Sequence, residues 1–169
     1  MKEYEGKGNW AIGKYYKPPF SLFYKKKLKL ILSLFPKGKV YHNILDFGSG
    51  PGIFLPSLKK KAIFVKGYEP GDIIDSRWRF EAIVCSSVLE FVNLESTLSL
   101  LFNLLKPGGQ IYIGSPMRTK LTSTYFSLIG DKHKRTPHTT IVSNIKQYFK
   151  IEEYHEWMNL YFVLRASKN

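Results

Sequence analysis

The chain has 169 residues, of which 44% are hydrophobic, enough for one compact domain with a single core. Its 26 basic and 13 acidic residues give a formal net charge of +13, which favours an anionic partner such as nucleic acid, an anionic membrane surface or an acidic small molecule. The single cysteine, Cys85, excludes an internal disulfide and a cysteine-based zinc cluster. Without a signal peptide or an apolar run of about 20 residues, the sequence favours a cytoplasmic protein.

The predicted elements alternate between helices and strands after an N-terminal arm. The expected boundaries are 1–19 for a polar and aromatic arm, 20–35 for a helix, 40–113 for alternating strands and helices, 122–129 for a short helix, 139–149 for the last helix, and 150–154 and 160–166 for two closing strands. This pattern is typical of an α/β fold with a mostly parallel sheet covered on both faces.

The most informative motif is the run ILDFGSGPG, from Ile44 to Gly52. It predicts a buried strand that ends after Asp46 in a glycine turn, where a ligand can approach the backbone. Dinucleotide-binding folds have the spacing G-x-G-x-x-G, whereas Gly48, Gly50 and Gly52 give G-x-G-x-G. Glycine turns also occur in other nucleotide binders and in ordinary tight turns, so the order of the following segments decides the interpretation.

Three further segments follow this turn in order. Residues 63–70 predict a second strand that ends in Glu69, about 20 residues after the turn, where a carboxylate can bind ribose hydroxyls. Residues 80–92 read FEAIVCSSVLEFV, and residues 104–113 contain the turn LKPGG before another strand.

Together these motifs resemble those of class I S-adenosylmethionine (SAM)-dependent methyltransferases, in particular the type 11-like group, over residues 40–115. The resemblance implies a Rossmann-like, mostly parallel sheet with helices on both faces and a C-terminal antiparallel strand pair. It also implies SAM as the cofactor. The single methyltransferase domain, 1–169, would comprise an arm (1–19), an N-terminal helix (20–35), the SAM-binding core (40–115), a substrate-side connection (116–140) and a C-terminal helix and strands (141–169).

The resemblance also implies the cofactor contacts. Glu69 would bind the ribose, and Asp46 would orient the turn or meet the amino group of the cofactor. The full implied set is Asp46, Gly48, Ser49, Gly50, Gly52, Glu69, Pro70, Asp72, Ser86, Ser87 and Val88. No metal ligand is expected.

The chain is shorter than the family pattern between the second and fourth strands. Only residues 71–79 stand where the family has a helix and a further strand, which together need about 16 residues. Asp72 would then lie near the adenine amino group, or it would be merely a turn residue. If that strand is missing, the second strand becomes a sheet edge, which invites covering by another segment or by a second subunit in a homodimer.

Alignment of the two reactants can supply much of the rate of methyl transfer, so no catalytic triad is required. The candidates for a general base are His133, His138 and Tyr112, with aromatic residues of the arm able to close the site. Cys85 lies in an apolar run, which indicates a buried core residue rather than a covalent nucleophile.

The helix over residues 20–35 has apolar residues at helical spacing with lysines between them, including Lys25, Lys26, Lys27 and Lys29. Such a helix could lie on a membrane interface. The favoured interpretation is a core-packing helix with a solvated lysine face. A second basic group lies at residues 132–135.

The acceptor class is narrowed by what the sequence lacks. The run Cys85–Val88 does not match the N/D-P-P-Y/F motif of adenine and glutamine methyltransferases, and the connection over residues 114–140 leaves room for only a modest substrate cover. We therefore expect methyl transfer to an O, N or C nucleophile of a small-molecule or lipid-like acceptor. The alternatives are a nucleic-acid (RNA) methyltransferase that uses the basic surface, and a noncatalytic partner subunit with a methyltransferase fold.

Overall fold

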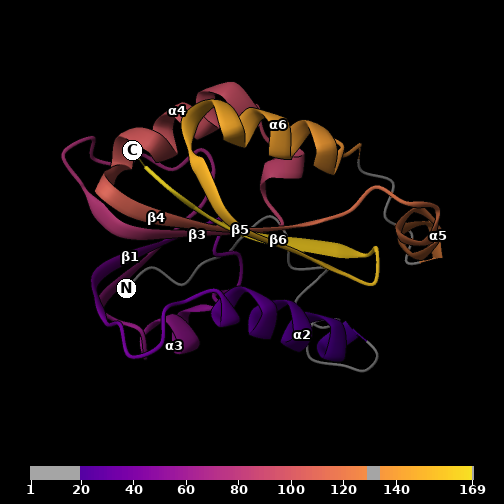
Figure 1. Ribbon diagram of the computed structural model, residues 1–169, viewed down its shortest axis with the longest axis horizontal. Coiled ribbons are helices and arrows are strands. Elements are labelled where there is room, and N and C mark those ends of the chain that lie inside the picture. Colours follow the sequence, from indigo (N-terminus) through magenta and orange to yellow (C-terminus); the bar gives the residue numbers. More distant parts are fainter. Residues whose placement is uncertain (1–19, 129–133, 169) are drawn as a thin grey trace.

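The structure, a computed structural model, describes residues 20–128 and 134–168 (Figure 1). The helices are α2 (Phe20–Ser33), α3 (Leu55–Leu58), α4 (Leu94–Leu104), α5 (Lys120–Leu128) and α6 (His138–Tyr148), with a 3-10 helix, η1, at Leu89–Phe91. The strands are β1 (Tyr41–Phe47), β2 (Ala62–Tyr68), β3 (Phe80–Ser86), β4 (Leu105–Pro116), β5 (Lys150–Trp157) and β6 (Tyr161–Ser167).

The strands form one six-stranded sheet in the order β2-β1-β3-β4-β6-β5. The first four strands run parallel, and β6 pairs antiparallel with both β4 and β5. This confirms the predicted fold class. From β1 the chain proceeds to β2 on one side and later to β3 on the other, so the strand order reverses there. In open α/β sheets ligands bind at such a switch point, beyond the carboxyl ends of the strands.

Helices cover both faces of the sheet, with α4 and α6 on one side and α2 and α3 on the other (Figure 1). Because successive side chains of a strand point to opposite faces, neighbouring residues of β1 belong to different cores. Leu45 packs in the cluster under α4 and α6, whereas Ile44 packs with Ile31 of α2. Covering on both faces explains why the central strands are almost continuously apolar.

The helix α2 packs against the sheet as predicted for a core helix. Its apolar face places Ile31 in the core with Leu34 and Phe35, which follow the helix, while Lys25 and Lys29 are exposed. Within the described ranges, none of the helices has the length and apolar character needed to cross a membrane.

The shortened segment between β2 and β3 contains neither helix nor strand, and β2 forms an edge of the sheet. Both features agree with the expectation from the short length of this segment. Trp78 lies between Phe64 of β2 and Phe80 of β3, with ring centroids 5.6 Å apart in both pairs and interplanar angles of 11° and 9°. This aromatic stack holds the segment against the sheet. Ile73, in contrast, is 99% exposed.

We expect Trp78→Ala to lower the free energy of unfolding by about 2 kcal/mol, because a half-buried indole loses two stacking partners. Ile73→Ala is the matched control from the same segment, and it should change stability by less than about 0.5 kcal/mol. Urea denaturation of the three proteins measures both values. Equal stability of the two variants would contradict the role of the stack.

Candidate cofactor-binding and active site

A cavity of about 470 Å³ lies beyond the carboxyl ends of β1, β2 and β3, at the switch point of the sheet. The predicted contacts that line it are Asp46, Gly48, Ser49, Gly50, Glu69, Pro70, Ser86, Ser87 and Val88. Further lining residues are Tyr24, Lys27, Pro51, Ile53, Phe54, Phe91 and Val92. The structure therefore brings together most of the predicted cofactor set, leaving out Gly52 and Asp72.

The glycine turn owes its path to backbone conformations that other residues rarely adopt. Gly48, Gly50 and Gly52 have φ angles of +75°, +50° and +74°. A Cβ atom on Gly48 would lie 1.9 Å from Cγ2 of Val88, so the exits of β1 and β3 can approach this closely only at a glycine. The Gly48 N–H also donates to the carbonyl of Tyr68 at 2.7 Å, which ties the turn to the end of β2.

The carboxylate of Glu69 links the end of β2 to the glycine turn. It accepts hydrogen bonds from the backbone N–H of Gly50 and, at 3.4 Å, from the hydroxyl of Ser49, and both bonds end on Oε1. Burial raises the pKa of Glu69, and the Gly50 N–H opposes this shift. The side chain is thus fixed at the cavity wall.

Asp46 is the most deeply buried carboxylate of this cavity. It is 2% exposed, and its Oδ2 atom has no hydrogen-bond partner. Burial raises the pKa of Asp46 to about 7. Because an unsatisfied buried carboxylate oxygen is costly, a ligand that carries a cationic N–H donor would be stabilised here.

Asp72 lies outside the cavity and stabilises a turn. Its Oδ2 accepts the backbone N–H of Glu69 at 2.9 Å, and its own N–H donates to the Glu69 carbonyl at 3.0 Å. The hydroxyl of Tyr68 donates to the Asp72 carbonyl. This is the geometry of the turn-residue alternative, and nothing in it brings Asp72 to a ligand.

Lys27 is a site residue that the sequence analysis missed. The predicted solvated lysine face is wrong at this position, because Lys27 is only 5% exposed and lines the cavity. It lies one turn from both Phe23 and Ile31, on the apolar face of α2, and this i±4 spacing is the signal that could have revealed it.

The ammonium of Lys27 has one polar and several aromatic contacts. Nζ donates to the Ser87 hydroxyl at 2.6 Å and lies 4.9 Å from the ring centroids of both Tyr24 and Tyr161. Burial lowers its pKa to about 8, and the charge of Glu90 opposes this shift. A lysine with this pKa is partly neutral near physiological pH and can accept a proton.

The two serines at the exit of β3 form a polar wall. The Tyr161 hydroxyl lies 3.1 Å from that of Ser86 and 3.4 Å from that of Ser87. Ser87 has a φ of 56°, an uncommon conformation for a residue other than glycine, and its N–H donates to the Gly114 carbonyl at 2.7 Å. These contacts fix Ser87 where it meets Lys27.

The structure places the predicted general bases away from the first cavity or outside the described residues. Tyr112 is fully buried, stacks on Phe35 with centroids 3.9 Å apart, and shares a 2.5 Å hydrogen bond with the Tyr41 hydroxyl, so this candidate is corrected to a core residue. Nδ1 of His138 accepts the backbone N–H of Arg118 at 3.0 Å, which fixes the ring. His133 lies outside the described residues.

Cys85 is buried in the core, as predicted. Burial raises the pKa of its thiol well above the ordinary value, and the nearby carboxylates add to the shift. A thiol in this state is a poor nucleophile.

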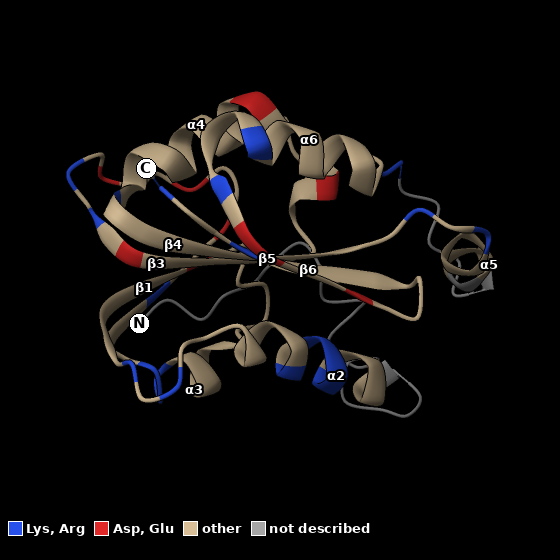
Figure 2. Cartoon of the chain, viewed as in Figure 1, with Lys and Arg blue, Asp and Glu red and all other residues tan. Residues whose placement is uncertain are grey.

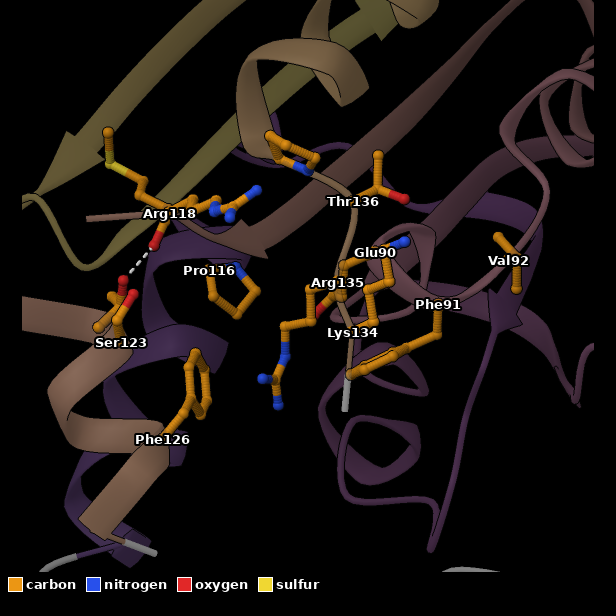
Figure 3. A pocket seen from close by; sticks show the side chains of 13 residues that line it. Glu90, Phe91, Val92, Pro116, Arg118, Ser123, Phe126, Lys134, Arg135 and Thr136 are labelled. Carbon is orange, nitrogen blue, oxygen red and sulfur yellow. Dashed lines mark hydrogen bonds between the residues drawn. The ribbon is translucent and has the colours of Figure 1, made fainter. Parts of the chain in front are cut away.

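A second cavity of about 610 Å³ adjoins the first, because Phe91 and Val92 line both (Figure 3). Its remaining lining residues are Glu90, Pro116, Met117, Arg118, Thr122, Ser123, Phe126, Lys134, Arg135, Thr136 and Pro137. It therefore lies between η1, the end of β4, α5 and the segment that leads into α6. The two cavities offer adjoining spaces for two reactants.

Residues 21–161 match a family model described as a methyltransferase domain. The chain belongs to the class I SAM-dependent methyltransferases. A search of curated proteins gave no match. SAM is the cofactor of this family.

Solved structures, several of them described as methyltransferases, share the fold at low sequence identity. The N-methyltransferase NodS from Bradyrhizobium japonicum, solved with S-adenosylhomocysteine (SAH), is 14% identical, with a TM-score of 0.65 over 92% of this chain and 90% of NodS. A possible histamine N-methyltransferase from Thermotoga maritima is 16% identical, with a TM-score of 0.66 over 88% of this chain and 90% of that one. The PH0226 protein from Pyrococcus horikoshii is 12% identical, with a TM-score of 0.71 over 92% and 94%.

We expect Lys27→Met to remove a pH dependence of stability. Because the folded-state pKa of Lys27 is lowered from 10.5 to about 8, the unfolded state binds more protons between these values, and stability rises with pH there. Relative to Lys27→Met, the wild type should gain about 2 kcal/mol of unfolding free energy between pH 7.5 and pH 10.

Lys29→Met is the matched control, since Lys29 is exposed on the same helix. Its unfolding free energy should follow that of the wild type at both pH values. Chemical denaturation of the three proteins measures the difference, and parallel curves for Lys27→Met and the wild type would show that Lys27 is not buried.

Proposed function

We propose that this methyltransferase is catalytically active, holds SAM in the first cavity and methylates an O, N or C nucleophile of a small-molecule or lipid-like acceptor in the second. The observation that carries the proposal is the buried, unpartnered Oδ2 of Asp46 at the wall of a cavity built by the glycine turn. The cofactor supplies an electrophilic methyl group on its sulfonium.

The residues around the first cavity suit the parts of this cofactor. Asp46 would hold the ammonium of the methionine part, and Glu69 the ribose hydroxyls. Gly48 and Gly50 give access to the backbone, and Val88 offers an apolar surface for the adenine. None of these proposed contacts with the cofactor involves a metal ion.

Transfer would take place where the cavities meet, at Phe91 and Val92. Placing the acceptor there supplies alignment, which lowers the barrier without a nucleophilic side chain. Lys27 is the buried cavity residue best suited to take up the acceptor proton at Nζ, since Ser87 holds that atom in place. The role of His133 as a general base stays a prediction.

The alternatives differ in what they require. A noncatalytic partner subunit would not need two adjoining cavities, so their presence favours an enzyme. An RNA methyltransferase would use the basic residues, which Figure 2 shows on α2, after α3 and on the segments that flank α5. Steeply salt-dependent RNA binding would favour it.

A cytoplasmic location and a homodimer through the β2 edge stay predictions.

Calorimetric titration with SAM and SAH tests the cofactor half of the proposal. We expect saturable binding of both ligands, and the absence of binding would leave the noncatalytic alternative. A methyl-transfer screen over metabolite, lipid and RNA pools then tests the acceptor half. Methylation of the RNA pool alone would overturn the small-molecule proposal.

We expect the affinity for SAH to rise about tenfold between pH 6 and pH 8. Asp46 has a pKa of about 7, so only about a tenth of the protein carries the charged carboxylate at pH 6. Asp46→Asn should bind SAH more weakly and with the same affinity at both pH values. Calorimetry at matched ionic strength measures these affinities, and an equal pH dependence in the variant would exclude Asp46 as the ammonium ligand.

We expect Glu69→Gln to weaken SAH binding by about tenfold, since a charged hydrogen-bond acceptor is replaced by a neutral one. Asp72→Asn is the matched control, because Asp72 lies three residues away but outside the cavity. Its affinity should stay within about twofold of the wild type. A larger loss in Asp72→Asn than in Glu69→Gln would revive the adenine contact for Asp72.

A further inference from the structure

We propose that the protein docks on an anionic membrane surface through the outer face of α2 and the tip of the β5–β6 hairpin. This docking surface consists of Leu22, Lys25, Lys26, Lys29 and Met158. The inference rests on the proposed function, since it names the surface from which a lipid-like acceptor would reach the second cavity.

The outer face of α2 is cationic and carries one large apolar side chain. Four residues of the helix follow the spacing i, i+3, i+4, i+7, which places them on one side, and all four are exposed. They are Leu22, Lys25, Lys26 and Lys29. Ile31, on the opposite side of α2, is buried against the sheet. Leu22, which is 65% exposed, therefore stands among three ammonium groups.

The β5–β6 hairpin extends this face with a second exposed apolar side chain. Trp157, the last residue of β5, packs on the core cluster at the α2 side of the sheet, and Nζ of Lys26 lies 5.9 Å from the centroid of its ring. Met158 follows directly and is 67% exposed. Because side chains alternate along a strand, Glu156 lies on the other face of β5, where its Oε1 accepts the Tyr154 hydroxyl at 2.7 Å.

Met158 has a backbone conformation that favours other residue types. The N–H of Leu160 donates to the carbonyl of Trp157 at 2.9 Å, and the two residues between them, Met158 and Asn159, have φ angles of +50° and +53°. Positive φ at both central residues is typical of a type I′ turn, which favours Asn, Asp or Gly at the first of them. Methionine there lowers stability and exposes an apolar side chain. Burial of that side chain in a lipid phase would offset the loss.

The charge of this side of the molecule fits an anionic partner. Residues 20–45 contain six lysines and no acidic residue. Figure 2 shows basic residues on α2 and after α3, whereas α4 and α6, on the other side of the sheet, carry both signs. Anionic lipid headgroups attract such a cluster of lysines.

The two exposed apolar side chains favour a membrane over a nucleic acid. Proteins bind phosphate backbones through cations and polar groups, and they bind unpaired bases through aromatic rings, so neither contact uses Leu22 or Met158. At a membrane interface, aliphatic side chains enter the boundary of the acyl chains while lysines stay among the headgroups. Nucleic acid is the alternative occupant that the experiment below tests.

The docking surface lies beside both cavities. Tyr24 and Lys27 of α2 line the first. The hydroxyl of Thr119 donates to the carbonyl of Asn159 at 3.0 Å, so α5 begins beside the tip of the hairpin (Figure 1). Thr122 of α5 lines the second cavity. An acceptor taken from the membrane would therefore enter the protein next to its proposed binding site.

The test measures co-sedimentation of the full chain with vesicles of phosphatidylglycerol and phosphatidylcholine in equal amounts, and with vesicles of phosphatidylcholine alone. We expect about tenfold tighter binding to the anionic vesicles, and a loss of about tenfold of that affinity in Lys25→Gln/Lys26→Gln. The matched control, Lys146→Gln/Lys150→Gln, removes the same charge from exposed positions on α6 and at the start of β5. Its affinity should stay within about twofold of the wild type.

Met158→Gly separates docking from folding. Glycine adopts a positive φ without strain, so the free energy of unfolding should not fall, whereas the affinity for anionic vesicles should drop about tenfold with the loss of the apolar side chain. Ile73→Ala is the control, because it removes an exposed apolar side chain beside β2, at the opposite edge of the sheet from β5. It should bind vesicles like the wild type.

Absence of binding to the anionic vesicles would overturn the inference. Equal losses in the test and control variants would also overturn it, because they would indicate attraction by net charge alone. Binding of poly(uridylic acid) that depends on Lys25 and Lys26, without vesicle binding, would assign the surface to nucleic acid instead. Calorimetry with SAH on the same proteins keeps the two proposals apart, since failure to bind SAH would overturn the proposed function and not the docking surface.

Discussion

The site depends on the close approach of β1 and β3 at their carboxyl ends, where Gly48 passes beside Val88. Any side chain on Gly48 would collide with Val88, and its φ of +75° also favours glycine. After Gly48 the turn approaches the end of β2, where the carboxylate of Glu69 accepts a hydrogen bond from the backbone N–H of Gly50. Three parallel strands are thereby joined at one edge of the sheet, and the cavity forms at the switch point because the strand order reverses there.

Among the described residues, three side chains of Lys, Arg, Asp or Glu are buried, and all three line the two cavities. Lys27 and Asp46 line the first cavity, and Glu90 lines the second. Burial lowers the pKa of Lys27 and raises those of Asp46 and Glu90, because desolvation favours the neutral form of each group. A fold selected for stability alone would place apolar side chains at these positions. Their presence near the carboxyl ends of the strands supports the proposed binding of a ligand and the proposed transfer of a proton.

The sequence predicted the strands around the glycine turn because each is a short apolar run that ends in turn residues. It also predicted the edge position of β2, since nine residues cannot form another helix and strand. Lys27 was grouped with its neighbouring lysines, although its spacing of four residues from both Phe23 and Ile31 places it on the apolar face of α2. Tyr112 was misjudged because alternation in β4 does not say which core receives its ring. The second cavity escaped prediction because it joins segments that are distant in the chain.

Phe91 connects the cofactor side of the site to the acceptor side. The methyltransferase motif that residues 80–92 resemble usually ends in V-L-E-H-V, with histidine at the fourth of these positions, whereas this chain reads Val88-Leu89-Glu90-Phe91-Val92. The ring of Phe91 lines both cavities and also lies beside the guanidinium of Arg135. A histidine could exchange a proton with the acceptor, but a phenyl ring can only exclude water and orient a cation. Under the proposed function, uptake of the acceptor proton therefore falls to another group, for which Lys27 is proposed, and Phe91 excludes water where the two cavities meet.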